Sequence, residues 1–273
     1  MSALAALSSA AVASPPIKDL GVIASGVTLS TTRPRGWRAV ADSRLLVVIG
    51  LTGTGKSTAM AELRAIAEPF SLLPNRREVT DKAIIPLYSD QPVNDRVERF
   101  ELTRRFARAN PGGMAHILTQ LSVDPEALPD PLVFDGLRGA DEVAHAAVVL
   151  PRARFLVLTA PDFVRLTRIV LRADAFDRTS ALTADEAGAV LSDAELLTPV
   201  ERFQLEGWMR LGALDPKDVR AKLNIVTAER RNYDADLAIK VLMEAAPERT
   251  FVVDTSAVPP HLVGMIAARV LAS

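Results

Sequence analysis

The stretch LLVVIGLTGTGKST, residues 45–58, is an apolar run that ends in a glycine-rich turn followed by Lys, Ser and Thr. Three of the 14 glycines in this 273-residue chain fall within six positions here. Gly50, Gly55, Lys56 and Ser57 match the pattern G-x-x-x-x-G-K-[ST] at each fixed position. Glycine reaches the φ values that let backbone N–H groups point inward around an anion. The stretch therefore predicts a strand, a phosphate-binding loop (P-loop) and a helix whose positive N-terminus faces the same phosphate.

The residues of this loop carry defined roles toward a nucleotide. Lys56 can reach the β- and γ-phosphates, and the Ser57 hydroxyl can ligate Mg²⁺. A phosphate-bound Mg²⁺ also needs a carboxylate at the end of a neighbouring buried strand, and Asp135 in PLVFDG is the candidate. A turn-capping Asp is the alternative reading of that residue. The expected nucleotide-binding residues are Gly50, Thr52, Gly53, Thr54, Gly55, Lys56, Ser57 and Thr58.

The residue that follows Asp135 is a glycine and not a glutamate. This argues against an AAA+-type motor, which carries Asp-Glu there to activate water. The guanine-reading motif Asn-Lys-x-Asp is also absent from the sequence, which argues against a Ras-like GTPase.

Composition excludes several other classes of protein. Apolar residues make up 49% and charged residues 24% of the chain, as in ordinary globular proteins. The net charge of −1 gives no global attraction to nucleic acid or membrane. Without cysteine there are no disulfides or thiolate sites, and the three histidines lie far apart in sequence. The N-terminal stretch lacks the charged region of a signal peptide, so we expect a flexible tail and a cytoplasmic protein that does not bind membranes.

From Arg44 onward, short apolar strands alternate with helices. This alternation predicts an α/β three-layer sandwich with a mostly parallel five-stranded sheet. We treat residues 1–40 as an N-terminal extension with a tail and a hairpin, and residues 41–273 as one domain. The expected strands are 44–49, 69–73, 131–135, 154–159 and 250–254, and the expected helices are 56–67, 95–109 (after Asn94 as N-cap), 140–149 and 259–271.

Residues 173–248 have no strong strand signal but repeated helix starts. The N-cap signals are at Thr183, Ser192, Thr198 and Asp215. We expect a helical insertion between the fourth and fifth strands of the sheet.

Three arginines follow the fourth expected strand. Arg165, Arg168 and Arg172 stand at i, i+3 and i+7, so they share one helical face. Arginines that converge on a phosphate site suit phosphoryl transfer, in which charge spreads over the equatorial oxygens. A solvated basic face on an amphipathic helix is the alternative.

GLTGTGKST, the strand end VFDG and APDFVRLTRIVLR together resemble P-loop kinases of the nucleoside-monophosphate-kinase and dephospho-coenzyme-A-kinase type. The resemblance covers roughly residues 44–172 and 230–273. It implies that the P-loop cradles ATP and that a helical lid supplies Arg168 and Arg172. It also implies that Asp254, Thr255 and Ser256 lie near the adenine. The insertion is longer than a simple lid, and residues 1–40 have no counterpart in that group.

In such kinases the acceptor is held by the segment after the second strand. Here that segment is rich in arginine, which suits bidentate binding of phosphate or carboxylate. Asp81 is the candidate for orienting or deprotonating an acceptor hydroxyl, and Arg138 is close enough in sequence to Asp135 to contact phosphate or acceptor. A surface helix of exposed Glu–Arg pairs is the alternative. The candidate acceptor-binding residues are Arg76, Arg77, Thr80, Arg96 and Arg99.

These features favour an ATP- and Mg²⁺-dependent phosphotransferase whose partner is a small, anionic or nucleotide-like acceptor. A nucleotide-dependent regulatory NTPase or scaffold that signals through the insertion is the alternative. A nucleic-acid 5′-end kinase is weaker, because the charge balance is neutral and aromatic residues make up only 5% of the chain. A homo-oligomer is left open.

Overall fold

A five-stranded parallel sheet forms the centre of the computed structural model, which describes residues 20–67, 69–172, 191 and 196–273. Its strands are β4 (Leu45–Ile49), β5 (Ser71–Leu72), β7 (Leu132–Leu137), β8 (Ala153–Thr159) and β9 (Thr250–Asp254), in the spatial order β5-β7-β4-β8-β9. Every pairing in this sheet is parallel, so the predicted α/β class and its five strands are confirmed. The strand order reverses at β4, and crevices at such switch points bind ligands in open α/β sheets.

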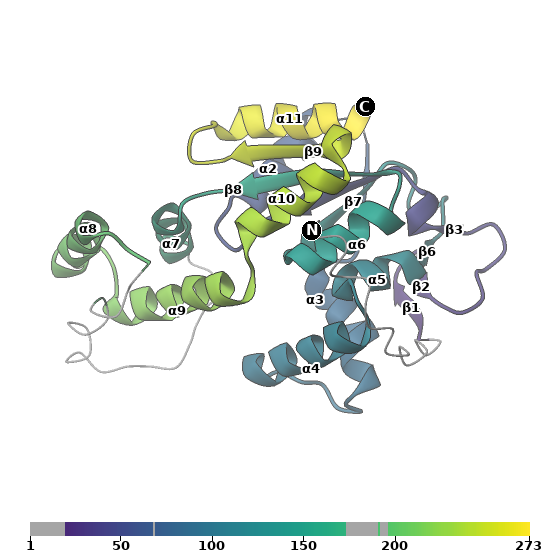
Figure 1. Cartoon of the computed structure of the whole chain (residues 1–273), viewed down its shortest axis with the longest axis horizontal. Coiled ribbons are helices and arrows are strands. Elements are labelled where there is room, and N and C mark those ends of the chain that lie inside the picture. The colour runs from purple at the N-terminus through teal and green to yellow at the C-terminus, as the bar shows by residue number, and fades with distance from the viewer. Residues whose placement is uncertain (1–19, 68, 173–190, 192–195) are drawn as a thin grey trace.

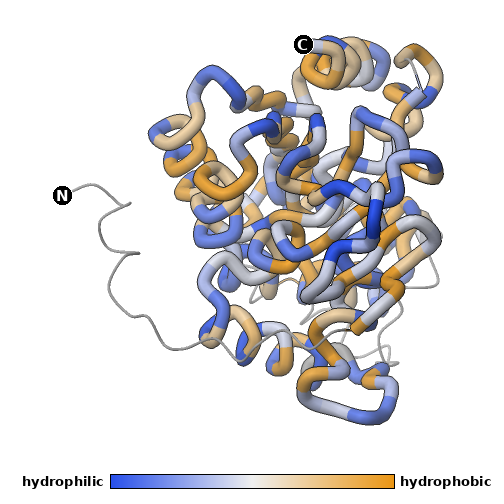
Figure 2. Tube along the Cα trace, turned by 90° about the vertical axis from the view of Figure 1, so that its right-hand side faces the viewer, coloured by the Kyte–Doolittle hydropathy of each residue, from blue (hydrophilic) through white to orange (hydrophobic). Residues whose placement is uncertain are grey.

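Helices cover both faces of the sheet (Figure 1). Leu46 and Val48 of β4 pack with α2 (Lys56–Ile66) and α11 (Pro260–Ala272) on one face. Leu45 and Val47 belong to the core that also contains residues of α5 (Gly113–Gln120), α6 (Ala140–Val149) and α10 (Ala235–Ala245). Strand β4 is buried on both faces, which explains why it is apolar throughout. Figure 2 shows apolar and polar residues alternating along the surrounding elements.

A second sheet joins the N-terminal segment to the middle of the chain. It is antiparallel and has the order β1-β2-β6-β3, from β1 (Gly21–Ala24), β2 (Val27–Leu29), β3 (Arg38–Ala39) and β6 (Leu121–Val123). The expected hairpin is therefore present as β1 and β2. The sequence interpretation set residues 1–40 apart, but in the described part Val27 and Leu29 belong to the same core as β4. Strands as short as β3 and β6 give no alternating pattern for sequence reasoning to detect.

Helices α8 (Pro199–Arg210) and α9 (Pro216–Asn232) of the insertion pack with α7 (Asp162–Val170), which precedes it, and we call these three helices the helical module. Its helices share an apolar core of their own, which includes Leu166, Leu205 and Val226. Figure 1 shows α8 and α9 extending away from the sheet. Helix α10 lies within the predicted insertion range but instead belongs to the core of the sheet domain.

Two of the predicted N-caps of the insertion are confirmed. Thr198 forms a capping box with Glu201 at the start of α8, and the Asp215 side chain accepts from Lys217 N–H at the start of α9. The helix starts expected at Thr183 and Ser192 lie outside the described residues, as does the tail up to residue 19.

Other boundaries differ from the expected ones. Helix α4 (Arg96–Ala109) is capped by Asp95, whose carboxylate accepts from Glu98 N–H, so the prediction of Asn94 was wrong. Strand β7 continues past Asp135 to Leu137, whereas the sequence predicted that it ends at the carboxylate. After β5 the chain forms α3 (Arg76–Val79), a π-helical turn (Thr80–Ile84) and a 3₁₀ turn (Ile85–Leu87). In the described part of the chain, no helix is both long and apolar enough to cross a membrane.

Candidate active site

The P-loop connects β4 to α2 and has the backbone geometry that its glycines predict. Gly53 and Gly55 have φ values of +84° and +85°, in the left-handed region that favours glycine. Gly53 also packs against α7, since a Cβ there would stand 2.7 Å from the Arg165 carbonyl oxygen. Helix α2 begins at Lys56 directly after Gly55, so its N-terminus faces the loop. The sequence motif therefore forms a loop that can surround an anion.

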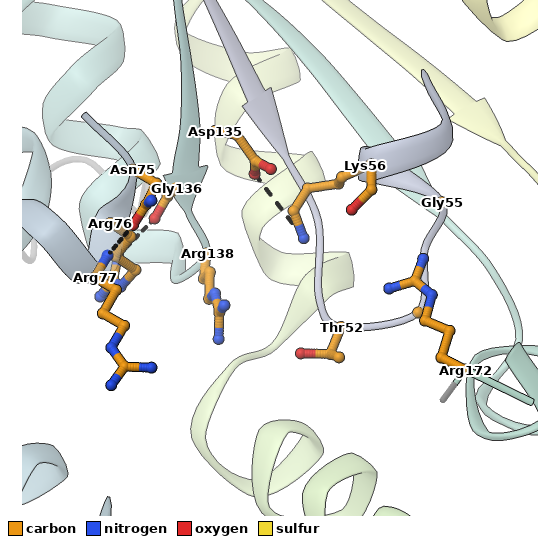
Figure 3. Close-up of a pocket in the computed structure, with 12 residues that line it drawn as sticks. Thr52, Gly55, Lys56, Asn75, Arg76, Arg77, Asp135, Gly136, Arg138 and Arg172 are labelled. Atoms are coloured by element: carbon orange, nitrogen blue, oxygen red, sulfur yellow. Dashed lines mark hydrogen bonds and ion pairs between the residues drawn. The ribbon is translucent and has the colours of Figure 1, made fainter. Parts of the chain in front are cut away.

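A cleft of about 260 Å³ opens beside the P-loop. Figure 3 shows Arg77 and Arg138 on one side of this cleft and Arg172 on the other. Of the predicted loop residues, Gly50, Thr54 and Thr58 do not line the cleft, and Thr54 is buried with its hydroxyl donating to Leu51 O. The lining residues are Thr52, Gly53, Gly55, Lys56, Ser57, Asn75, Arg76, Arg77, Asp135, Gly136, Arg138 and Arg172.

Lys56 folds back over the loop. Its Nζ donates to Gly50 O at 2.9 Å and Leu51 O at 3.2 Å, and it lies 4.0 Å from Asp135 Oδ1. Burial lowers the pKa of Lys56 to about 8, and Asp135 opposes that shift while Arg138 adds to it. The ammonium group therefore lacks full charge compensation in this state, and a phosphate would supply it.

Asp135 lies opposite Val48 in the pairing of β7 with β4, next to the P-loop strand. Its Oδ1 is buried and accepts no hydrogen bond from the described residues. Burial raises the pKa of Asp135, against the opposing effects of Lys56 and Arg138. A buried carboxylate oxygen without a hydrogen-bond donor, near the exposed hydroxyl of Ser57 in the same cleft, fits an oxygen-ligated cation such as Mg²⁺.

Arg165 and Arg168 of α7 face the P-loop, but Arg172 does not share their helical face as predicted, because α7 ends at Val170. Arg165 is 2% exposed, and its Nε donates to Thr52 O at 2.9 Å. Arg168 donates to Gly53 O and to both the Oγ1 and the carbonyl oxygen of Thr255. Arg172 lines the cleft. The solvated-face alternative is therefore wrong for Arg165, whereas the predicted catalytic roles of Arg168 and Arg172 stay predictions.

Of the three residues expected near the adenine, Thr255 contacts the P-loop. Its hydroxyl donates to Thr54 O at 3.0 Å and accepts from Arg168. Asp254 and Ser256 bind each other, with the Ser256 hydroxyl 2.6 Å from Asp254 Oδ1. These hydrogen bonds lower the pKa of the exposed Asp254. Neither Asp254 nor Ser256 lines the cleft.

On the acceptor side, Arg76 and Arg77 line the cleft from the start of α3. Arg76 forms a two-point ion pair with Glu142 of α6, at 2.7 and 2.8 Å, and donates to Gly136 O. Burial by itself would lower the pKa of Arg76, but Glu142 more than reverses this and raises it. The carboxylate of Glu142 thus compensates the charge of Arg76. The side chain of Arg77 is the more exposed of the two arginines.

Thr80, Asp81 and Arg99 are not among the described residues that line the cleft. Asp81 pairs with Arg99 at 2.5 Å and with Arg77 at 3.8 Å. Thr80 is buried at the start of the π-helical turn. The side chain of Arg96 lies outside the part that the structure describes. An acceptor role for these residues stays a prediction.

Sequence reasoning missed two buried acids of the site, Glu142 and Glu229. Glu142 of α6 also accepts hydrogen bonds from the N–H groups of Arg138, directly after β7, and of Met114 in α5. It therefore connects the end of β7 to α5 and α6. Glu229, near the end of α9, accepts hydrogen bonds from Thr52, Arg138 and Arg165. Glu229 occupies a helix rich in charged residues, and Glu142 lies in the first turn of α6, where an acid is expected as an ordinary helix-start residue. For Glu229 the sequence offers one signal: the residue falls on the same face of α9 as the apolar Val226, which indicates that its side chain is buried.

The sequence matches no protein-family model and no curated protein. Among solved structures, the chain is similar to a sulfotransferase from Alicyclobacillus acidocaldarius, with 13% identity, a TM-score of 0.33 and coverage of 84% of this chain and 81% of that one. It is also similar to TT1252 from Thermus thermophilus, with 18% identity, a TM-score of 0.33 and coverage of 68% of this chain and 97% of that one. Both likenesses are too weak to indicate a reaction.

Proposed function

We propose that the protein is an ATP- and Mg²⁺-dependent phosphotransferase that moves the γ-phosphoryl group of ATP to a small anionic acceptor. The observation that carries this proposal is the charge of the cleft beside the P-loop. Among the described residues that line it, five side chains are basic (Lys56, Arg76, Arg77, Arg138 and Arg172), and one, Asp135, is acidic; Arg76 and Arg138 are also paired with Glu142 and Glu229, which do not line the cleft. A cleft of this charge suits two anionic groups that must be brought together.

In such a transfer, different residues of the cleft would have different roles. The P-loop N–H groups and Lys56 would hold the β- and γ-phosphates, while Ser57 and Asp135 would hold Mg²⁺. When bound, Mg²⁺ neutralises charge on the phosphate oxygens. Arg172 and Arg138, on opposite sides of the cleft in Figure 3, would stabilise the charge that spreads over the transferred group.

The acceptor side is argued from Arg77 and Asn75. Both line the cleft at the start of α3, where Asn75 caps the helix through its side chain. The guanidinium of Arg77 favours a carboxylate or phosphate on the acceptor. Because Asp81 pairs with Arg99 outside the cleft lining, its role as a base requires that this ion pair rearrange when the acceptor binds.

The position after Asp135 supports an acceptor other than water. A Cβ at Gly136 would stand 2.7 Å from the Phe134 ring and 2.9 Å from Arg76 Cβ. The close packing of Arg76 therefore leaves no space for a glutamate that could activate water at this position. Transfer to a bound acceptor needs only positioning and charge stabilisation, which the cleft residues can supply.

The test is to incubate the protein with Mg²⁺, ATP and pools of phosphorylated sugars, nucleoside monophosphates and small carboxylic acids, and to identify phosphorylated products by mass spectrometry. We expect one pool to yield a product together with an equal amount of ADP. The control variants are Lys56→Ala, which should form no product, and Lys240→Ala, on the exposed surface of α10, which should behave as wild type. ADP without any product would contradict the proposal and favour a regulatory NTPase.

A further inference from the structure

The helical module is attached to the P-loop by polar contacts, although its own interior is apolar. Its core residues form a cluster separate from the two clusters that line the sheet. On the side toward the P-loop, Arg165 and Glu229 face Thr52, and both of these charged side chains are at most 5% exposed. The burial of charged groups is unfavourable in free energy unless they are paired and hydrogen-bonded. The contact of Arg165 and Glu229 with Thr52 therefore depends on an ordered set of hydrogen bonds.

Glu229 is at the centre of this contact and uses both of its carboxylate oxygens. Oε2 accepts from Thr52 N–H at 2.9 Å and from Arg165 Nη2 at 2.5 Å. Oε1 accepts from the Thr52 hydroxyl at 2.6 Å and from Arg138 Nη1 at 3.1 Å. One carboxylate therefore joins the P-loop, α7, α9 and the segment after β7.

Two of the three residues that donate to Glu229 line the cleft, although Glu229 itself does not. Thr52 and Arg138 are both lining residues, on the P-loop and on the acceptor side respectively. Arg138 Nε is buried and has no hydrogen-bond partner among the described residues, so Glu229 provides the side-chain contact that directs this guanidinium. The position of Arg138 relative to the P-loop is thus set through α9.

The contact is suited to persist when a ligand binds. Withdrawal of Glu229 would leave the guanidinium of Arg165 buried with only Asp162 as its acid partner. Removing one member of a buried charged network is strongly unfavourable. A second ion pair, between Arg230 and Asp162 at 2.7 Å, holds the same end of α9 against α7.

We propose that Glu229 is a positioning residue that fixes Thr52 and Arg138 in the cleft, so that the helical module and the P-loop act as one rigid unit. Its effect on the reaction rests on the phosphotransferase function proposed above. Its effect on the loop does not, because Glu229 bonds the amide and the hydroxyl of Thr52 directly. Glu229 acts through Arg138 and Thr52 and is not itself a catalytic residue.

The kinetic test is a double-mutant cycle with Glu229→Gln and Arg138→Met. We expect each single change to lower kcat about 10²-fold, the scale for losing one stabilising donor, with a much smaller change in the Kd for ATP. If Glu229 acts in part through Arg138, Glu229→Gln should slow the Arg138→Met protein less than it slows wild type, and the remaining loss reflects Thr52. Losses that multiply in the double variant would overturn the proposal. Glu206→Gln, which changes a surface glutamate paired with Arg210, is the matched control and should leave kcat unchanged.

A second measurement separates this proposal from the proposed function. Amide hydrogen exchange of the nucleotide-free protein should show Thr52 N–H protected in wild type and at least about tenfold less protected in Glu229→Gln, with β4 unchanged. If Glu229→Gln does not fold, Thr52→Val removes only the hydroxyl bond to Glu229 Oε1 and keeps the amide bond to Oε2, so its amide should lose protection to a smaller extent. Equal protection in wild type and variant would overturn the proposal. Loss of protection without phosphoryl transfer to any acceptor would contradict only the function.

Discussion

Lys56 Nζ lies 4.0 Å from Asp135 Oδ1; Lys56 begins α2 after the loop that follows β4, and Asp135 lies within the adjacent parallel strand β7. The separation is too long for a strong hydrogen-bonded pair, and Asp135 Oδ1 accepts no hydrogen bond from the described residues. The ammonium group of Lys56 and the carboxylate of Asp135 therefore lie side by side in one cleft without forming a close ion pair. This is the arrangement that a phosphate and its cation require.

Replacement of Lys56 by alanine should abolish most nucleotide turnover. The change removes the only ammonium group among the described cleft-lining residues, so we expect a loss of about 10²–10³-fold in kcat/KM. Turnover is measured as ADP release at fixed Mg²⁺. A Lys56→Ala rate within a few-fold of wild type would mean that the P-loop assignment is wrong.

Replacement of Asp135 by asparagine should raise the Mg²⁺ concentration needed for activity. The amide keeps the shape of the side chain but loses the charge that would attract the cation, and an effect of about 10–100-fold is reasonable for a lost metal contact. Activity is titrated with MgCl₂ for wild type and variant. Asp141→Asn, at the start of α6 and outside the cleft lining, serves as control. An unchanged Mg²⁺ midpoint would exclude Asp135 as a metal ligand.

Substitutions of Arg172 and Arg168 should differ in their effects on kcat and on ATP binding. Arg172 lines the cleft, so Arg172→Ala should lower kcat by about 10²-fold with a smaller effect on ATP binding. Arg168 is bound to Gly53 O and Thr255, so Arg168→Ala should loosen the P-loop and weaken ATP binding together with thermal stability. Steady-state kinetics, isothermal titration and thermal melts compare the two. Equal losses of kcat and affinity in Arg172→Ala would indicate a structural role for that residue.

The buried pair of Arg76 and Glu142 should make the fold sensitive to acid. Burial alone would raise the pKa of Glu142, but Arg76 and the N–H groups of Arg138 and Met114 lower it below the usual 4.5. The unfolded chain then binds the proton more readily than the folded one. The stabilisation is therefore fully present above about pH 4.5 and is lost as the pH falls through the lower folded value.

We expect Glu142→Gln to remove this part of the acid dependence in urea unfolding experiments. At neutral pH the variant should lose about 3–5 kcal/mol of unfolding free energy, because Arg76 keeps a buried charge without its partner. Glu244→Gln, on the exposed side of α10, should leave both quantities unchanged. An acid dependence in Glu142→Gln as steep as in wild type would show that another carboxyl group is responsible.

Features that depend on neighbouring residues could be predicted from the sequence. The five strands of the parallel sheet, the helix after Lys56 and the caps Thr198 and Asp215 each follow from a short pattern, and the structure contains all of them. The end of β7 was misplaced, because Asp135 lies within the strand and polar residues usually mark its end. Of the antiparallel sheet only the β1–β2 hairpin was expected, and β3 and β6 were missed because they are two and three residues long.

The site shows the same division between local and distant relationships. By itself the sequence determined the phosphate-binding loop, because the φ values of Gly53 and Gly55 and the start of α2 are set within eight consecutive residues. Only the tertiary structure decided which charges meet there. Glu229 reaches Thr52 across 177 positions, and Glu142 reaches Arg76 across 66. Such pairings depend on how helices pack against the sheet and leave no trace in the local pattern of a charged helix.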